Sequence, residues 1–282
     1  MINKKLLCPV CHTKLLLDAN GKTLRCEKPE RPHAFDIAAS GYVNLALGHS
    51  GGGDSKECVR SRSDFLSLGH YKPISEKMNE LADKYLSDGE TLLDAGCGEG
   101  YYTVSLAKTA KKKNALTVGI DISKPAVEHT AKSAKHEGLS ELIPLVSSIY
   151  ELPLSDCSVS VVTSIFAPCP ENEFSRVLKD GGHLIIAAAG ENHLMGLKKA
   201  LYETVYTNED RADLPSEEKF ELVEKDTLSY KIELGSNKEI LDLFAMTPYY
   251  YRTSLSDKEK LPGLDTLVTE VQIDFSVYRK NS

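Results

Sequence analysis

The stretch TLLDAGCGEG, residues 91–100, decides the fold of this chain, and YYT follows it at 101–103. Its first half is an apolar run of strand length, and glycines stand at positions 96, 98 and 100. Glycine allows a sharp turn and a close approach of the backbone to a ligand, because it has no side chain. The stretch therefore predicts a strand that ends in a ligand-binding loop.

On the C-terminal side of this stretch, helices and apolar strands alternate. Strands are predicted at 116–123, 142–148, 159–166 and 182–190, and helices at 101–111, 124–137 and 171–179. This alternation predicts an α/β fold, a doubly wound parallel sheet with helices on both faces and ligands at the carboxyl ends of the strands. Residues 225–235 and 266–279 alternate apolar and polar side chains, which predicts a closing antiparallel pair.

The spacing of the glycines separates two classes of nucleoside cofactor. In a dinucleotide-binding motif the third glycine would fall at position 101, where this chain has tyrosine. Glycines at 96, 98 and 100, with Asp94 before them, form the pattern of S-adenosylmethionine binding in a Rossmann-like methyltransferase domain. An ordinary strand-to-helix turn is the alternative interpretation.

An acid at the end of the second strand favours the cofactor interpretation. Asp121 stands 25 residues after Gly96, and its carboxylate can accept hydrogen bonds from both ribose hydroxyls. Many enzymes of this type also place an acid four residues before a Leu-Pro pair to hold the adenine amino group; here that residue is Ser148. The candidate cofactor-binding residues from the sequence are Asp94, Gly96, Cys97, Gly98, Glu99, Gly100, Tyr101, Asp121, Ile122 and Ser148.

Three cysteines and a histidine near the N-terminus predict a structural zinc site. Cys8 and Cys11 are spaced so that two thiolates converge from one turn, and a hairpin through Asn20-Gly21 would return Cys26 to them. His33 is the best-placed fourth ligand, because His12 adjoins Cys11 and would strain to share the ion. The Cys-x-x-Cys-His pattern also occurs at haem attachment sites, which a single copy here does not favour.

Composition and charge place these motifs in an intracellular globular protein. The chain has 282 residues, 41% of them hydrophobic and 27% charged, with no apolar run of membrane-span length and no signal peptide, so we expect a cytoplasmic protein that does not enter membranes. Seven cysteines, an odd number, argue against a disulfide framework. Residues 1–70 carry a net charge of +3 within a total of −7, so the remainder carries −10.

Two domains with a connecting segment are predicted. A zinc-binding domain covers residues 1–45 and a methyltransferase domain covers 46–282. In the connector, Gly51–Ser55 is predicted as a flexible loop, and Asp54 or Ser55 as the cap of a helix beginning near Lys56. Arg60 and Arg62 lie on different faces of that helix and are either solvated or bound to phosphate. An amphipathic helix is predicted next, with Ile74, Met78, Leu81 and Tyr85 on its buried stripe.

The chain resembles the large-subunit ribosomal RNA guanine-N1 methyltransferases, the family that includes macrolide (tylosin-type) resistance enzymes. The resemblance covers nearly the whole chain and rests on the joint occurrence of CPVC with a later C and HAFD, and of GYVNL, DAGCGEGYYT, GIDISK, FAPC, HLMGLK and MTPYYYR. It implies zinc on Cys8, Cys11, Cys26 and His33, although the interval from Cys26 to His33 is longer than in some relatives. It also implies that Tyr71, the glycine loop, Asp121 and His193 surround S-adenosylmethionine.

The resemblance further implies what the enzyme does. A homodimer would grip a hairpin of 23S ribosomal RNA, with the zinc module as a recognition arm, and methylate N1 of one guanine there, with macrolide resistance as a further implication. A purely structural zinc staple is the alternative for the module. For the whole chain, the alternatives are a small-molecule methyltransferase of the quinone or sterol type, which would generally lack the zinc module, and a non-catalytic RNA-binding protein.

The catalytic residues are unknown at this level, because no residue is recognisable as the base that takes the guanine N1 proton. FAPC lies where a target base would bind, so Phe166 is a candidate for stacking and the carbonyls of Ala167 and Pro168 are candidate acceptors. A covalent role for Cys169 suits pyrimidine chemistry and not guanine N1. The segment Tyr249–Arg252 offers either stacking and phosphate contact or core packing.

Overall fold

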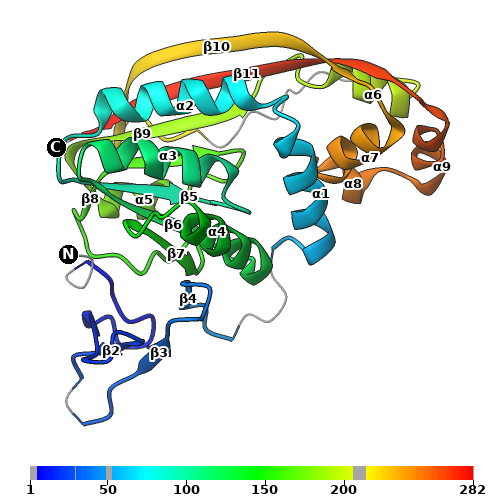
Figure 1. Ribbon diagram of the computed structural model, residues 1–282. Coiled ribbons are helices and arrows are strands. Elements are labelled where there is room, and N and C mark those ends of the chain that lie inside the picture. The colour runs from blue at the N-terminus through cyan, green and yellow to red at the C-terminus, as the bar shows by residue number, and fades with distance from the viewer. Residues whose placement is uncertain (1–4, 29, 49–52, 206–213, 282) are drawn as a thin grey trace.

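The computed structural model describes residues 5–28, 30–48, 53–205 and 214–281. Its strands form two sheets, a small one near the N-terminus and a large one in the rest of the chain (Figure 1). The smaller sheet is antiparallel and consists of β1 (Leu15–Leu17), β2 (Thr23–Cys26) and β3 (Ala34–Asp36). Leu15 lies opposite Cys26, so the predicted hairpin through Gly21 is confirmed. This sheet and the residues before it carry the four predicted zinc ligands and are called the zinc module.

The larger sheet has eight strands in the order β10-β11-β9-β8-β5-β6-β7-β4. Its strands from β4 to β9 pair in parallel, and β11 pairs antiparallel with both β9 and β10, which confirms the predicted α/β fold and closing pair. The bounds are β4 (Val43–Asn44), β5 (Thr91–Ala95), β6 (Leu116–Asp121), β7 (Leu142–Val146), β8 (Val159–Ile165), β9 (Leu178–Ala189), β10 (Phe220–Leu234) and β11 (Leu267–Lys280).

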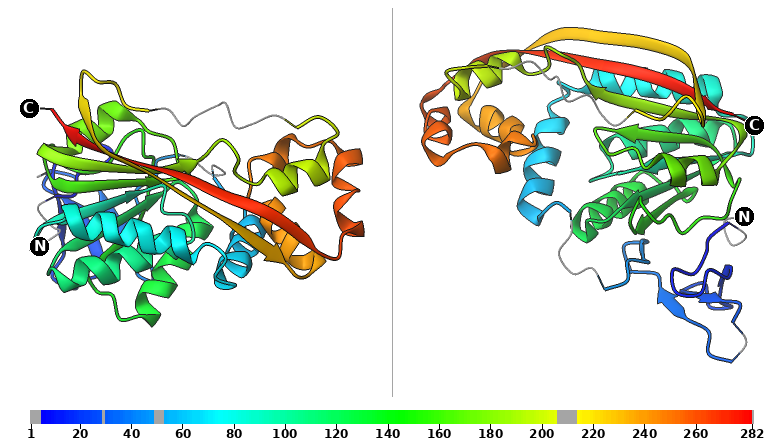
Figure 2. Two further views of the ribbon diagram at one scale, coloured as in Figure 1. Left: turned by 90° about the horizontal axis from the view of Figure 1, so that it is seen from above. Right: turned by 180° about the vertical axis from the view of Figure 1, so that it is seen from behind.

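Helices cover both faces of this sheet. The chain moves from β5 to β6 to β7 in one direction and from β8 to β9 in the other, so right-handed crossovers place α3 (Tyr101–Lys112) and α4 (Lys124–His136) on one face and α5 (Glu171–Val177) on the other (Figure 2). The predicted helix 171–179 ends at Val177, because Leu178 is already extended and pairs with β8. The amphipathic helix is α2 (Lys72–Tyr85), and Ile74, Met78 and Leu81 are buried as predicted.

The zinc module packs directly on the part of the chain that contains the large sheet. Leu6 forms a bridge with Leu154, and Leu6 and Leu24 share a buried apolar cluster with Leu154 and with residues of β5 and β8. The two-residue strand β4 then joins the edge of the large sheet beside β7. The division of the chain at residue 45 stays a prediction, since the contacts across it are extensive.

Helices at the other end of the molecule form a second appendage, which the sequence did not predict. They are α6 (Met195–Leu201), α7 (Asn237–Ala245), α8 (Tyr249–Arg252), α9 (Leu255–Lys258) and the turn η2 (Leu261–Gly263), called here the cap helices. The long β10–β11 ribbon carries most of them past the sheet, away from the zinc module (Figure 1). Among the described residues, no helix has both the length and the apolar character needed to cross a membrane.

Helix α1 (Lys56–Ser67) lies between the helices that cover the large sheet and the cap helices. It packs against α4 on one side and α7 of the cap helices on the other. Ser55 is its N-cap and accepts a hydrogen bond from the backbone N–H of Cys58, which confirms one of the two predicted caps. Gly51 and Gly52 of the predicted flexible loop lie outside the described residues.

Candidate cofactor site and metal cluster

The glycine loop lies at the point where the strand order reverses. The chain leaves β5 in one direction toward β6 and returns on the other side to β8, so the loops after β5 and β8 flank one crevice. Gly96 has φ +82°, and a Cβ there would lie 2.6 Å from Cβ of Ala167 in the loop after β8. Gly100 has φ +92°, and its Cβ would lie 2.7 Å from Thr130 of α4. Larger residues would therefore push apart the two loops and the helix behind them.

Asp94 holds this loop from below. Its side chain is buried, with one carboxylate oxygen accepting a hydrogen bond from Thr103 at 2.5 Å and the other from Thr163 at 2.7 Å. Burial raises the pKa of the Asp94 carboxyl group. Both oxygens are bonded within the protein, so Asp94 supports the glycine loop.

Asp121 ends β6 beside the loop and is placed to bind a diol. One carboxylate oxygen accepts the N–H of Gly98 at 3.0 Å, and the other accepts the N–H of Ser123 at 2.7 Å. Burial raises the pKa of Asp121, and these two backbone donors oppose the shift. Each carboxylate oxygen can accept a second hydrogen bond, so both can bind a ribose hydroxyl while holding the loop.

The remaining candidates from the loop and the strand ends surround Asp121. Cys97 is buried and its thiol contacts the carbonyl of Gly98, while Ile122 and Ser148 follow the ends of β6 and β7. Ser148 accepts the N–H of Tyr150 at 3.1 Å. Ser148 therefore puts a short hydroxyl at the position where many enzymes of this type have an acid.

Tyr71 and His193 form a buried pair beside Phe166 of the loop after β8. The Tyr71 hydroxyl lies 3.5 Å from Nε2 of His193, and Nδ1 of His193 accepts the backbone N–H of Gln272 at 3.3 Å. Since Nδ1 is an acceptor, the neutral ring carries its proton on Nε2 and donates to Tyr71. Burial and, to a smaller extent, the positive charge of nearby Lys198 lower the pKa of His193 to about 3.

Phe166 completes an aromatic group at the crevice. Its backbone has φ +53°, the residue is 44% exposed, and its ring stacks on His193 with ring centroids 6.1 Å apart. Tyr71 lies 6.5 Å from the same ring. The carbonyls of Ala167 and Pro168 both accept a hydrogen bond from Ser164, so that hydroxyl fixes the turn that presents the ring.

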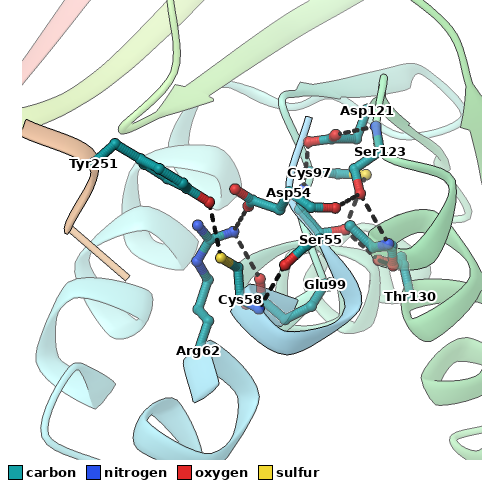
Figure 3. Close-up of polar contacts among 12 residues, drawn as sticks. Asp54, Ser55, Cys58, Arg62, Cys97, Glu99, Asp121, Ser123, Thr130 and Tyr251 are labelled. Carbon is teal, nitrogen blue, oxygen red and sulfur yellow. Dashed lines mark hydrogen bonds and ion pairs between the residues drawn. The ribbon is translucent and has the colours of Figure 1, made fainter. Parts of the chain in front are cut away.

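The connector is bound to the loop by an ion-pair network that the sequence did not reveal (Figure 3). Arg62 of α1 pairs with Asp54 and lies 3.5 Å from Glu99 of the glycine loop, and Ser123 donates to the carbonyl of Asp54 at 2.8 Å. The sequence predicted that Arg62 is either solvated or bound to phosphate. Instead, its side chain is only 23% exposed and pairs with two carboxylates of the protein. No spacing in the sequence marked this pairing, because Asp54 precedes the helix and Glu99 lies 37 residues after Arg62.

The segment 249–252 divides between packing and exposure. Tyr249 is half-buried and lies under the ammonium group of Lys198, 5.4 Å from its ring centroid. Tyr251 is 69% exposed, and its hydroxyl lies 3.0 Å from the Cys58 thiol, which ties α8 to α1 (Figure 3). Both predicted roles thus remain available to different members of the segment.

The four predicted zinc ligands come together in the small module. The ligand atoms of Cys8, Cys11, Cys26 and His33 all lie within 4.8 Å of one another. Nδ1 of His33 lies 3.4 Å from Sγ of Cys8, so His33, and not His12, is the fourth residue of this cluster. Three thiols and one imidazole are the donor set of a closed, tetrahedral structural zinc site. These residues therefore fit zinc.

Comparisons with known proteins agree with both halves of the chain. A family model described as "Methyltransferase domain" matches residues 86–244, and one described as "RlmA, N-terminal", a zinc ribbon, matches residues 6–46.

Two relatives match most of the chain and a third matches only half. "Putative 23S rRNA (guanine-N(1)-)-methyltransferase" of Micromonospora griseorubida is 30% identical over 88% of this chain and 87% of its own length. "23S rRNA (guanine(748)-N(1))-methyltransferase" of Streptomyces fradiae is 32% identical over 70% of this chain and 67% of its own. "Demethylmenaquinone methyltransferase" of Oceanobacillus iheyensis is 29% identical over 50% of this chain and 61% of its own.

Proposed function

The chain belongs to the RlmA-like family of 23S rRNA (guanine-N1)-methyltransferases. We therefore propose that it methylates N1 of a guanine in a hairpin of 23S ribosomal RNA. That it is an RNA methyltransferase of the S-adenosylmethionine-dependent type follows from the family. The observation that carries the finer proposal is the joint presence of the zinc module and the cofactor loop in one chain. The demethylmenaquinone enzyme, a small-molecule methyltransferase, matches only half of this chain, which disfavours the small-molecule alternative.

The residues at the crevice fit S-adenosylmethionine. Asp121 would hold the ribose hydroxyls, Ile122 and Ser148 would line the adenine side, and the loop from Gly96 to Gly100 would lie over the methionine moiety. Tyr71 and His193 would close the site from above. The cofactor supplies a methyl group on a positively charged sulfur, which a nucleophile can attack in line.

The aromatic group suits a base that has been flipped out of an RNA helix. Phe166 offers a half-exposed ring beside the loop, and stacking on such a ring would position guanine with N1 toward the methyl group. Most of the rate acceleration would come from this positioning. His193 is poorly suited as the base for the N1 proton, because one ring nitrogen accepts a backbone N–H and its pKa is about 3.

The zinc module would contribute RNA recognition. Its described residues expose basic side chains on and around the β1–β2 hairpin, namely Lys14, Lys22, Arg25, Lys28 and Arg31. Positive groups at such a site attract phosphates, in a chain whose remaining surface is acidic overall. A cytoplasmic homodimer that grips the hairpin, and a contribution to macrolide resistance, complete the proposal on the basis of the family resemblance.

Methyl transfer from labelled S-adenosylmethionine to unmethylated 23S RNA tests the proposal, with the product mapped by reverse transcription. A methyl group on guanine N1 blocks the Watson–Crick edge, so we expect one new strong stop at a hairpin guanine. Label in RNA without a stop would exclude N1 as the target atom. Cofactor binding without transfer to naked RNA or to ribosomal particles would favour a small-molecule substrate.

A further inference from the structure

Tyr102, in the first turn of α3, has a buried hydroxyl without a hydrogen-bond partner among the described residues. Two other buried side-chain oxygens share this property, on Thr117 and Glu141. Those two lie at the amino ends of β6 and β7, away from the cofactor loop. Tyr102 follows the last glycine of the loop by two positions, at the carboxyl ends of the strands. A buried hydroxyl without a partner lowers stability, so its position at a ligand site points to a ligand atom.

The neighbours of Tyr102 are the aromatic side chains of the crevice. Its ring lies 6.4 Å from Phe166, the ring proposed to stack on the target base, and 5.0 Å from Tyr101. Burial raises the pKa of Tyr102 well above its usual value, and the negative charge that Tyr71 would carry if ionised adds to the shift. The hydroxyl therefore stays protonated and can donate a hydrogen bond throughout the working range of pH.

We propose that the hydroxyl of Tyr102 donates a hydrogen bond to an anionic oxygen of the bound reactants. This inference rests on the proposed function and has two possible sources of that oxygen. One is the carboxylate of the methionine moiety, and the other is guanine O6, which becomes negative as N1 loses its proton. A hydrogen bond to a charged acceptor is about twice as strong as one between neutral groups. Such an acceptor would compensate for burying the hydroxyl without a partner.

The variant Tyr102→Phe tests the proposal, because it removes the hydroxyl and keeps the ring. Affinity is measured for S-adenosylmethionine and for decarboxylated S-adenosylmethionine, which lacks the carboxylate. If the carboxylate is the acceptor, the variant binds S-adenosylmethionine about tenfold more weakly and the decarboxylated compound as well as the wild type does. If guanine O6 is the acceptor, both affinities are unchanged, single-turnover transfer falls about tenfold, and its pH profile shifts upward, since N1 becomes less acidic.

Two controls separate these results from a loss of folding. The melting temperature of Tyr102→Phe without ligands should equal or exceed that of the wild type, because the variant removes an unpaired buried hydroxyl. Tyr85→Phe removes a tyrosine hydroxyl that donates to Glu224, far along α2 from the crevice, and should leave both affinities and the transfer rate unchanged.

Equal affinities and equal single-turnover rates for wild type and Tyr102→Phe would overturn the proposal. If the wild type binds S-adenosylmethionine but does not methylate RNA, the proposed function fails. In that case the two cofactor titrations alone decide on Tyr102, and an unchanged ratio between them overturns its assignment.

Discussion

At the scale of single residues, Asp121 combines two tasks in one carboxylate. It accepts the N–H of Gly98 and of Ser123, and it retains acceptor capacity for a ribose diol. Asp121→Asn replaces one acceptor oxygen by a donor, which faces a backbone N–H or a hydroxyl. We expect the affinity for S-adenosylmethionine to fall about ten- to a hundredfold, in line with roughly 1.5–3 kcal/mol for a hydrogen bond to a charged group.

Isothermal calorimetry measures this effect, and Asp88→Asn is the matched control, because Asp88 is exposed in the turn before β5. An Asp121→Asn protein that binds the cofactor as tightly as the wild type would exclude Asp121 as the ribose ligand.

The lowered pKa of His193 should make the free energy of unfolding depend on pH. Its pKa is lowered from 6.5 to about 3 in the folded protein, so below pH 6.5 the unfolded state binds a proton that the folded state does not. Its contribution is therefore fully present above pH 6.5 and is lost as the pH falls toward 3. The free energy of unfolding should fall by about 1.4 kcal/mol per pH unit in that interval on account of this residue.

Urea unfolding at about pH 7.5 and about pH 5.5 measures this pH dependence. His193→Gln should reduce the difference between the two free energies of unfolding by about 1.4 kcal/mol, because only the pH unit below 6.5 contributes to it. The exposed His136 provides the control, since His136→Gln should leave the slope unchanged. A His193→Gln slope equal to that of the wild type would mean that the ring is protonated in the folded state.

Which site residues the sequence could predict depends on how local their signal is. The zinc ligands and Asp121 are of residue types that carry chemistry, and they stand at motif spacings within one hairpin or one strand-helix unit. Arg62 and Tyr102 gave no such signal, because their roles depend on partners that the fold brings near. The same holds for the support of Asp94 by Thr163, which is 69 residues away in the sequence.

At the scale of elements, the periodicity of buried side chains predicted the parallel strands and the helices between them. The two-residue strand β4 was missed because so short a segment has no period, and it is a strand only through its pairing with β7. The cap helices were missed because α8 and α9 have four residues each, and they pack on α7 and η2, which the fold brings to them.

Helix α1 is predicted to hold the cofactor loop in place through Arg62. Glu99 is 5% exposed, and burial raises its pKa while Arg62 opposes that shift. Arg62→Gln leaves this carboxylate without its cation. Breaking a buried ion pair costs about 3–5 kcal/mol, and because Arg62 is partly exposed we expect a loss of about 3 kcal/mol in the free energy of unfolding. We also expect weaker S-adenosylmethionine binding, because Glu99 belongs to the loop.

Chemical unfolding and calorimetry on the same samples measure both effects. Arg62→Gln combined with Glu99→Gln should recover part of the lost stability, because the pair is then neutral. Arg60→Gln, an exposed position on the same helix, is the control and should change neither quantity. Additive losses in the double variant would show that Arg62 and Glu99 do not interact.

At the scale of the whole molecule, the zinc module and the cofactor site are separate parts. The cluster of predicted zinc ligands has Cys26 on β2 and its other members in the segments beside the small sheet. Asp121 and the glycine loop lie at the carboxyl ends of parallel strands in the large sheet, and Figure 1 shows the two sheets apart. The module still shares an apolar cluster with the large sheet through Leu6 and Leu24. Loss of the metal should therefore lower the overall stability and disrupt the module, while leaving the residues that bind the cofactor in position.

Cys26→Ser tests this separation of roles. We expect the wild type to contain one zinc ion per chain and the variant to lose it, because a closed structural site needs all four ligands. The melting temperature should fall, the affinity for S-adenosylmethionine should stay within about twofold, and methyl transfer to 23S RNA should fall at least about tenfold, since phosphate contacts dominate RNA affinity. The exposed Cys157 lies outside the cluster, so Cys157→Ser should retain zinc, stability and transfer.

If zinc-free protein methylates RNA at the wild-type rate at a temperature where it stays folded, the module is a structural staple. RNA recognition would then have to come from the methyltransferase domain, whose exposed Tyr251 and Arg252 would be the next residues to replace.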